Sequence, residues 1–181
     1  MKKINLGSGN DYLAGCVNVD NNIHSKADVI HDLNLYPYPF KDSEFDEVLA
    51  NHIIEHLDDP LDFIQEIYRI SKNDAKITIK CPHFSCNWFH PRHKSAISTK
   101  LFDFLDNSNS EYYKNVSFVV DKVSLKWMRN TNLGKRRNLI IKLLNCLNNF
   151  FANLNVSFAE RIWCYWVGGF EEIIFEVRVK K

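Results

Sequence analysis

Short apolar runs separated by turn-forming residues dominate the first half of the chain. Five runs have strand length, and we expect strands at residues 3–6, 16–19, 27–33, 45–50 and 76–81. Between the last two runs, Asp59 and Pro60 predict a helix start, with Asp as the N-cap and Pro at the first helical position. Apolar residues at helical spacing follow from Leu61, and Asn73-Asp74 is expected to end this helix. Strands that alternate with helical or loop connections predict a parallel α/β sheet.

The second half of the chain is less regular. Its expected elements are a short helix capped by Ser98 or Thr99 and ending at Leu105, a polar loop at 106–115, a strand at 116–127 bent at Asp121-Lys122, a helix at 136–154 and a strand at 173–179. Two late strands close together suit an antiparallel hairpin at one sheet edge. We therefore expect an α/β fold, a Rossmann-like doubly wound and mostly parallel sheet with an antiparallel edge hairpin. Only about nine residues, 7–15, join the first two strands, so the first crossover helix should be shortened.

Length and composition limit the class of protein. The chain has 181 residues, of which 45% are hydrophobic and 13% aromatic, and its formal net charge is +1. These values fit one globular domain, residues 1–181, and give no electrostatic argument for a nucleic-acid partner. No apolar run reaches the roughly 18 residues of a membrane span, and the N-terminus lacks the apolar core of a signal peptide. The five cysteines are scattered without a Cys-x-x-Cys pair, so we expect reduced thiols in a cytoplasmic protein.

The strongest chemical signal lies near the start of the chain. Gly7-Ser8-Gly9 follows the first strand, and Asp20 follows the second. Glycines at a strand end let the backbone approach a ligand closely, and an acid after the next strand can accept hydrogen bonds from both hydroxyls of a ribose. A nicotinamide dinucleotide is disfavoured, because Tyr12 occupies the third glycine position and the acid arrives only 13 residues after Gly7. A nucleoside cofactor without phosphate, such as S-adenosylmethionine, fits this loop better.

An ordered series of motifs extends from the glycine loop to residue 105. It comprises Ile4-Asn5-Leu6-Gly7-Ser8-Gly9, Asp20, Asp32-Leu33, Pro39-Phe40-x-Asp42-x-x-Phe45-Asp46 and Asn51-His52-Ile53-Ile54-Glu55-His56-Leu57. This series resembles the class I S-adenosylmethionine-dependent methyltransferases. The resemblance implies a cofactor held by Leu6, Gly7, Ser8, Gly9, Asp20, Asn21, Asp32, Leu33 and Asn51. One departure is Asn5, which stands where the family usually has an acid two residues before the first glycine.

Five of the seven histidines fall between residues 52 and 93. His52 ends the fourth expected strand and His83 follows the fifth, so both should lie at the carboxyl edge of the sheet, where doubly wound sheets bind ligands. Methyl transfer to a hydroxyl needs a base that removes the acceptor's proton, and a neutral imidazole suits this task near pH 7. His83 and His52 are therefore the candidate catalytic bases, with a structural or substrate-orienting role as the alternative for each.

Residues 90–94 form a compact basic run. We expect His90, Arg92 and His93 to bind a phosphate or carboxylate of the acceptor, and a solvated loop is the alternative. Metal binding has two candidate ligand sets. His52, Glu55 and His56 resemble the Glu-x-x-Glu-His that binds a divalent cation in some ubiquinone-pathway methyltransferases, and His83, His90 and His93 form a second, nitrogen-rich set. Neither set has a tight signature, so we expect no metal.

Segments 82–115 and 131–168 are expected to form loops and a cap on the acceptor side of the domain. Residues 135–158 open with three basic residues and are mostly apolar on one side. Such a helix would cover the sheet or cap the acceptor site, and a dimer contact or a membrane-surface helix are the alternatives. We expect a monomer or a homodimer without a stable membrane span.

The sequence therefore favours an S-adenosylmethionine-dependent methyltransferase that methylates oxygen on a small phosphorylated or glycan-linked acceptor. Similar short methyltransferases tailor bacterial surface polysaccharides, so the resemblance implies a role in polysaccharide modification. The alternatives are a cofactor-binding protein without catalysis, a metal-dependent hydrolase that uses the histidine cluster, and a nicotinamide dehydrogenase. Fold alone does not decide among acceptors.

Overall fold

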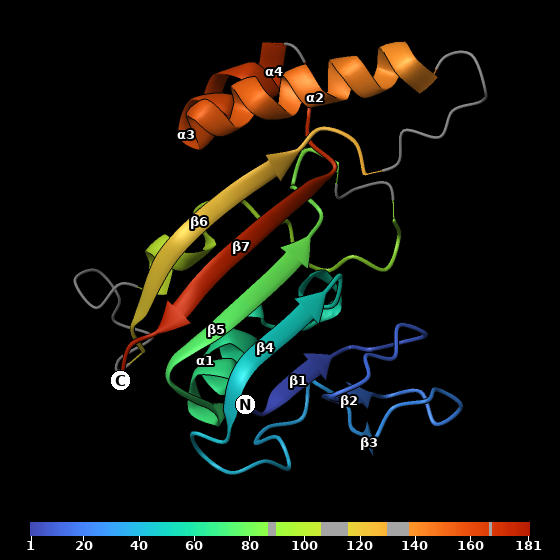
Figure 1. The fold of residues 1–181 in the computed structure, drawn as a ribbon, viewed down its shortest axis with the longest axis vertical. Helices are drawn as coiled ribbons and strands as arrows, with labels where there is room; N and C mark the ends of the chain where they lie inside the picture. Colours follow the sequence, from blue (N-terminus) through green and yellow to red (C-terminus); the bar gives the residue numbers. More distant parts are fainter. Residues whose placement is uncertain (87–89, 106–115, 130–137, 167) are drawn as a thin grey trace.

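The computed structural model describes residues 1–86, 90–105, 116–129, 138–166 and 168–181. Within these residues, a mixed sheet of seven strands has the order β3-β2-β1-β4-β5-β7-β6 (Figure 1). The strands are β1 (Lys3–Leu6), β2 (Cys16–Asp20), β3 (Val29–Ile30), β4 (Phe45–Asn51), β5 (Ser71–Cys81), β6 (Phe118–Lys126) and β7 (Glu172–Val179). Neighbours among β1 to β5 pair in parallel, whereas β7 runs antiparallel to both β5 and β6. The predicted mostly parallel sheet with an antiparallel edge is confirmed.

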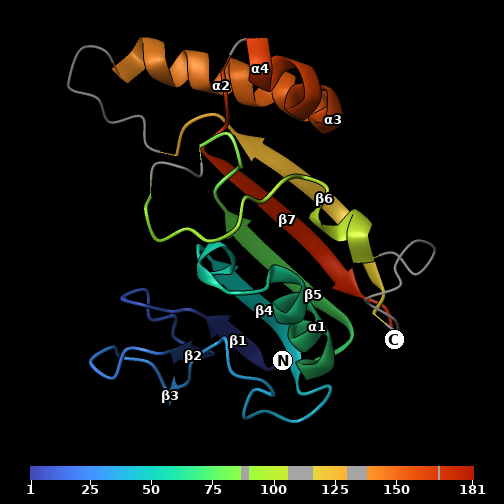
Figure 2. The ribbon, with the colours of Figure 1, turned by 180° about the vertical axis from the view of Figure 1, so that it is seen from behind.

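The main helices lie in two positions, one against a face of the sheet and one beyond its edge. They are η1 (Ile54–His56), α1 (Pro60–Ile70), η3 (Leu101–Leu105), α2 (Asn138–Leu154), α3 (Val156–Phe158), the π-helical turn η4 (Ala159–Trp163) and α4 (Cys164–Trp166). Helix α1 lies against the face of β4 and β5 (Figure 2). Helices α2, α3 and α4 lie beyond the carboxyl end of β6 (Figure 1).

Alternating apolar residues of the central strands form one core with the apolar side of α1. In β4 and β5, Val48, Ala50, Ile77 and Ile79 are at most 1% exposed. The buried side chains of α1 are Phe63, Ile64, Ile67 and Ile70 together with the acid Glu66. Each large apolar side chain buried in this way contributes about 1.5–3 kcal/mol. The strands and α1 therefore depend on each other for their stability.

Helix α1 begins as the sequence predicts. The carboxylate of Asp59 accepts hydrogen bonds from the backbone N–H groups of Leu61 and Asp62 at 2.7 and 3.3 Å, and Pro60 is the first helical residue. An N-cap of this kind contributes about 0.5–2 kcal/mol.

The end of α1 differs from the prediction. The helix ends at Ile70 rather than at Asn73-Asp74, and Ser71 already pairs with Phe45 in the sheet. The backbone N–H of Glu44 donates to the carbonyl of Ile70 at 2.7 Å. Helix-terminal carbonyls need such partners, and a distant turn supplies this one before the local sequence would end the helix.

The third strand is also shorter than predicted, with only Val29–Ile30 of the expected 27–33 in the ladder. Just before it, the carboxylate of Asp28 accepts from the backbone N–H and the side-chain amide of Asn18, at 2.7 and 3.0 Å. These side-chain bonds add to the one backbone bond there, from the N–H of Asp28 to the carbonyl of Asn18 at 2.8 Å. The ladder of β6 shifts register between Val120 and Lys122, which confirms the expected bend. The predicted loop at 106–115 and the first residues of the 136–154 helix lie outside the described residues.

No helix occurs in residues 7–15, so the shortened first crossover is confirmed. Two buried asparagines hold this connection instead. The Asn5 amide donates to the carbonyl of Asp11 at 3.0 Å, and the amide of Asn18 both accepts from and donates to the backbone of Leu13, at 2.9 and 3.0 Å. The two side chains also meet each other at 3.1 Å. Their amides satisfy backbone groups that a helix would otherwise pair.

A stripe of asparagines attaches α2 to the free edge of β6 and the residues after it. The side-chain oxygens of Asn145, Asn149 and Asn153 accept from the backbone N–H groups of Met128, Trp127 and Leu125, at 3.2, 2.7 and 2.8 Å. The amides of Asn145 and Asn153 also donate to the carbonyls of Met128 and Leu125. Edge strands carry unpaired backbone groups that invite other chains to pair with them, and this stripe covers part of that edge.

The apolar residues of α2 point away from the protein. Leu139, Ile140, Leu143, Leu144, Leu147, Phe150, Phe151 and Leu154 are all exposed, as are Tyr165 and Trp166 of α4. In the part of the chain that the structure describes, no helix is both long and apolar enough to cross a membrane. The apolar side of this helix therefore does not cover the sheet, because its asparagine side faces β6. The other half of the expectation, that the helix caps the acceptor site, stays a prediction.

We predict that Asn149→Ala lowers the free energy of unfolding by about 0.5–1.5 kcal/mol, because the N–H of Trp127 loses its acceptor. Urea unfolding followed by tryptophan fluorescence measures the change. Asn148→Ala is the matched control, since Asn148 is adjacent on α2 and lies outside the stripe. Equal stability of the two variants would show that the stripe does not hold α2.

Candidate functional site

The glycine loop folds back onto the end of β2. Gly7 and Gly9 have φ values of +70° and +50°, which favour glycine. The backbone N–H of Ser8 donates to the carbonyl of Val19 at 2.9 Å, and that of Gly9 donates to the Asp20 carboxylate at 2.7 Å. The predicted tail-binding loop and the predicted ribose acid are therefore in direct contact.

Five of the nine predicted cofactor residues line one cavity of about 80 Å³, namely Gly7, Asp20, Asn21, Asp32 and Leu33. Alone, this cavity is smaller than the roughly 300–1,000 Å³ of a typical ligand pocket. It shares Asn21, Ile53 and His56 with a neighbouring cavity of about 660 Å³. The two cavities thus adjoin one another along these shared walls.

The remaining predicted cofactor residues lie around the same strand ends. Leu6 is the last residue of β1 and is fully buried. Asn51 ends β4 and lines a third cavity of about 630 Å³, beside residues 10–13 and 24–26. The hydroxyl oxygen of Ser8 and the amide oxygen of Asn51 are buried without a hydrogen-bond partner among the described residues. Unpaired buried polar atoms are costly, so both atoms fit contacts to the polar tail of the expected cofactor.

The predicted cofactor residues Asp32 and Leu33 are held by their own turn. The Asp32 carboxylate accepts from the backbone N–H of Asn34 at 3.0 Å. Leu33 is 4% exposed, and its carbonyl accepts from the Tyr38 hydroxyl at 2.9 Å. Burial raises the pKa of Tyr38 far above its ordinary value, so this hydroxyl keeps its proton and donates. Both residues are therefore fixed in place at the cavity.

His52 lies between two carboxylates at the carboxyl edge of the sheet. Its Nε2 is 2.9 Å from Oε1 of Glu172, and its Nδ1 is 3.3 Å from Oε1 of Glu55. Its φ of +52° is uncommon for a residue with a side chain and costs about 1–3 kcal/mol. Burial alone would lower the pKa of His52, but the bonds with Glu172 and Glu55 outweigh burial and raise it. This imidazole therefore holds a proton more strongly than an ordinary histidine.

Glu172 is the centre of this charge cluster, and it begins β7. Besides His52, its carboxylate meets Lys126 Nζ at 2.7 Å and Arg129 Nε at 3.2 Å. Burial would raise the pKa of Glu172, but the hydrogen bonds from His52 and Lys126 lower it to about 2. Glu172 therefore stays ionised and ties β4, β6 and β7 together at the edge where ligands are expected.

His83 has a very different environment. The side chain is fully buried and packs against Phe84 and Phe170, with ring centroids 4.3 and 5.7 Å away. Its Nδ1 is 2.7 Å from the Ser85 hydroxyl and accepts from the Ser85 N–H at 3.2 Å. Burial lowers the pKa of His83 to about 4, so the ring is neutral at pH 7. Its Nε2 is buried without a partner among the described residues.

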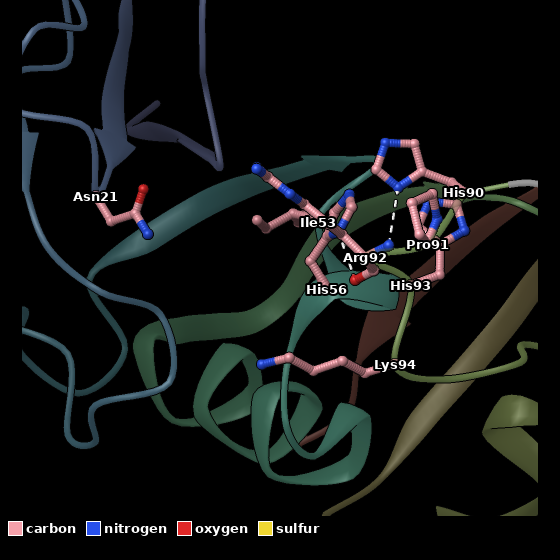
Figure 3. Close-up of a pocket in the computed structure, with 8 residues that line it drawn as sticks. All are labelled: Asn21, Ile53, His56, His90, Pro91, Arg92, His93 and Lys94. Carbon is pink, nitrogen blue, oxygen red and sulfur yellow. Dashed lines mark hydrogen bonds between the residues drawn. The ribbon is translucent and has the colours of Figure 1, made fainter.

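The basic loop lines the larger cavity beside the cofactor residues. That cavity of about 660 Å³ is bounded by Asn21, Ile53, His56 and residues 90–94. Figure 3 shows His56, His90, Arg92 and His93 gathered on one side, with Asn21 across from them. The three predicted acceptor-binding residues thus lie together and share one cavity wall with His56.

The sequence prediction missed Glu172. The sequence predicts that the last strand begins at residue 173, so this acid falls just outside the predicted strand. A usable signal existed, because an antiparallel strand begins at the same edge where its parallel neighbours end. The first residue of β7 therefore reaches the site, although no local motif marks it.

Comparison with known proteins supports the fold and the cofactor. Residues 9–79 match the family model described as a methyltransferase domain. No curated protein matches the chain. Among solved structures, the chain is similar to a SAM-dependent methyltransferase from Archaeoglobus fulgidus, with a TM-score of 0.55 and 17% identity over 99% of this chain and 86% of that one. It is also similar to an S-adenosylmethionine-dependent methyltransferase from Mesorhizobium loti, with a TM-score of 0.56 and 8% identity over 98% and 90% of the two chains.

The chain has the fold of S-adenosylmethionine-dependent methyltransferases, and its residues 9–79 match the methyltransferase-domain model. At these low sequence identities, the structural similarity shows the fold but does not identify the methyl acceptor. The [4+2]-cyclase SpnF illustrates this, because it is similar to the chain with a TM-score of 0.56 and 11% identity over 99% of this chain and 74% of that one. The acceptor must therefore be argued from the site itself.

We predict that Gly7→Ala weakens binding of S-adenosylhomocysteine at least about tenfold, the equivalent of about 1.4 kcal/mol. A Cβ on Gly7 would lie 2.7 Å from Cγ1 of Ile53, which lines the cofactor cavity, so Ile53 must move. Gly15→Ala is the control, because Gly15 has a φ of +83° but open space around its Cβ position. Isothermal titration calorimetry compares the two variants, and equal losses of affinity would contradict this account of Gly7.

We also predict that His52 titrates above pH 6.5 in an NMR titration, whereas His83 stays neutral down to about pH 4. Because the folded-state pKa of His52 is raised, its contribution to stability is present below about pH 6.5 and is lost as the pH rises through that pKa. Glu172→Gln removes one carboxylate and should lower the His52 pKa. Glu176→Gln, an exposed position on the same strand, should leave it unchanged. An unmoved His52 pKa in Glu172→Gln would disprove the pairing.

Proposed function

We propose that this protein transfers the methyl group of S-adenosylmethionine to an oxygen atom of a small acceptor that carries a phosphate or is linked to a glycan. When bound, the cofactor supplies an electrophilic methyl group on a sulfonium. The observation that carries the proposal is the basic cavity of about 660 Å³, which shares Asn21, Ile53 and His56 with the cofactor cavity. An acceptor in the larger cavity would lie beside the cofactor.

The charge of the larger cavity favours an anionic acceptor. Lys94 is neutralised by Asp58, whose carboxylate lies 2.6 Å away. Among the described residues, no carboxylate pairs with the exposed guanidinium of Arg92. A guanidinium binds phosphate through two parallel hydrogen bonds, so Arg92 is suited to orient such a group, with His90 and His93 beside it.

Of the two candidate bases, His52 fits the role better. His83 is fully buried, and its lowered pKa makes it a weak proton acceptor. The side chain of His52 is 22% exposed, and two carboxylates stabilise its protonated form, which strengthens the base. Its contact with Glu55, at 3.3 Å, is the longer of the two, and an acceptor hydroxyl could replace it. His83 then positions Ser85 and the chain around Phe170.

Segments 82–115 and 131–168 would enclose the acceptor side. The described parts of the two segments meet where Glu160 of η4 accepts from the backbone N–H of Thr99 at 3.0 Å and also contacts the Thr99 hydroxyl. Glu160 is buried, so this contact is shielded from water. The resemblance to short methyltransferases of polysaccharide modification supports a glycan-linked acceptor.

Radiolabelled S-adenosylmethionine tests the proposal against a panel of sugar phosphates and glycans with free hydroxyls. We expect label transfer to oxygen of a phosphorylated or glycan-linked member, and Arg92→Ala should raise the KM for a phosphorylated acceptor about tenfold or more, since a charged hydrogen bond contributes about 1.5–3 kcal/mol. Lys72→Ala, at the opposite end of β5, is the control cation. Cofactor binding without label transfer to any member would favour the non-catalytic alternative, and absence of cofactor binding would overturn the proposal.

A further inference from the structure

We propose that Glu55, His56 and His93 form a binding site for a divalent transition-metal ion, with zinc as the preferred ion. One ligand atom from each residue lies within 4.8 Å of the other two. Glu55 and His56 come from η1 at the end of β4, whereas His93 comes from the basic loop. The site therefore joins two segments that lie far apart in the sequence.

Glu55 offers a buried carboxylate oxygen for which the described residues supply no hydrogen-bond partner. The residue is 1% exposed, and its Oε1 faces His52, but its Oε2 has no hydrogen-bond partner among the described residues. A buried carboxylate oxygen without a partner costs several kcal/mol unless a cation or donor meets it. A metal ion bound by this carboxylate would compensate its charge.

The hydrogen bond of His56 leaves the correct nitrogen available. Its Nδ1 lies 3.2 Å from the carbonyl of Arg92, and a carbonyl can only accept, so Nδ1 carries the proton. The lone pair is then on Nε2. Histidines that ligate metals commonly donate their other N–H to a backbone carbonyl or carboxylate in this way, which fixes the orientation of the ring.

The basic loop is anchored so that His93 faces His56. The backbone N–H of Lys94 donates to the carbonyl of Glu55 at 2.8 Å, which ties the loop directly to the first ligand. The ring centroids of His56 and His93 are 4.9 Å apart, and His90 stacks on His93 at 4.7 Å. Figure 3 shows the three rings grouped at the cavity wall.

Two imidazoles and one carboxylate are the ligand set of several zinc sites that keep an open fourth position. A tetrahedral ion with bonds of about 2.0–2.1 Å brings its ligand atoms to about 3.3 Å from one another. The ligand atoms here lie within 4.8 Å, so the partly buried side chains of His56 and His93 must move toward Glu55 when the ion binds. The open position would face the cavity of about 660 Å³. In that position the ion could bind an oxygen atom of the acceptor. This consequence rests on the proposed function, whereas the proposal of the metal site does not rest on it.

This ligand set keeps Glu55 and His56 of the first set that the sequence offers and takes His93 from the second. His52 precedes Glu55 by three residues, but both of its ring nitrogens already face carboxylates. His83 is buried, with Nδ1 held by Ser85. Only the folded loop brings His93 to Glu55 and His56.

Calorimetric titration of the untagged full chain with Zn²⁺ alone, without cofactor or acceptor, tests the site. We expect one ion per chain. Glu55→Gln, His56→Ala and His93→Ala should each weaken binding about 100-fold or more, because even outer partners of a metal ligand change affinity 10–100-fold. His24→Ala is the control, since His24 is exposed and lines a different cavity. Circular dichroism verifies that each variant is folded.

X-ray absorption of the zinc complex identifies the ligands. We expect imidazole nitrogen and carboxylate oxygen without sulfur, and sulfur ligation would assign the ion to one of the five cysteines and overturn the site. Absence of saturable binding, or unchanged binding by His93→Ala, would overturn it as well. Arg92→Ala keeps the carbonyl that orients His56, so it should retain zinc while losing acceptor affinity. The metal site and the proposed function can therefore fail separately.

Discussion

The cofactor side of this protein depends on the buried contact between the side chains of Asn5 and Asn18, which meet at 3.1 Å. With no helix between β1 and β2, the backbone of the connection needs other partners, and these two amides supply them at Asp11 and Leu13. The loop is then short and rigid enough for the N–H of Gly9 to reach the Asp20 carboxylate at 2.7 Å. Asn5 stands where the family that the sequence resembles usually has an acid. In this protein its side chain holds the connection between β1 and β2 through hydrogen bonds.

Patterns of neighbouring residues in the sequence were enough to predict the strands and the start of α1, because both depend on interactions between residues close together in the chain. The strands follow from apolar runs, and the start of α1 follows from Asp59 and Pro60, because a cap acts on neighbouring residues. The end of α1 could not be predicted, since the carbonyl of Ile70 accepts from Glu44 on a distant turn. The same limit applies to the site: the glycine loop and its acid are local motifs, whereas the pairing of His52 with Glu172 spans 120 residues.

Burial and charge divide the histidines into three kinds. His52 is flanked by carboxylates and holds its proton more strongly, while His83 is enclosed by aromatic rings and holds its proton weakly. His56 and His93 line the larger cavity, and a ligand atom of each lies within 4.8 Å of a carboxylate oxygen of Glu55. The sequence places five histidines between residues 52 and 93 but does not show which of them are buried or paired with carboxylates. Their environments distinguish a histidine paired with carboxylates, a fully buried one and a group of three that lines the larger cavity.

The asparagine stripe of α2 explains why its apolar side faces outward. In most surface helices the apolar residues face the core and the polar residues face water. Here Asn145, Asn149 and Asn153 bind backbone groups at and just beyond the carboxyl end of β6, and directional hydrogen bonds of this kind fix the rotation of the helix about its axis. The leucines and phenylalanines on the other side are then exposed as a geometric consequence. Protection of the sheet edge and exposure of an apolar surface are thus two results of the same set of bonds.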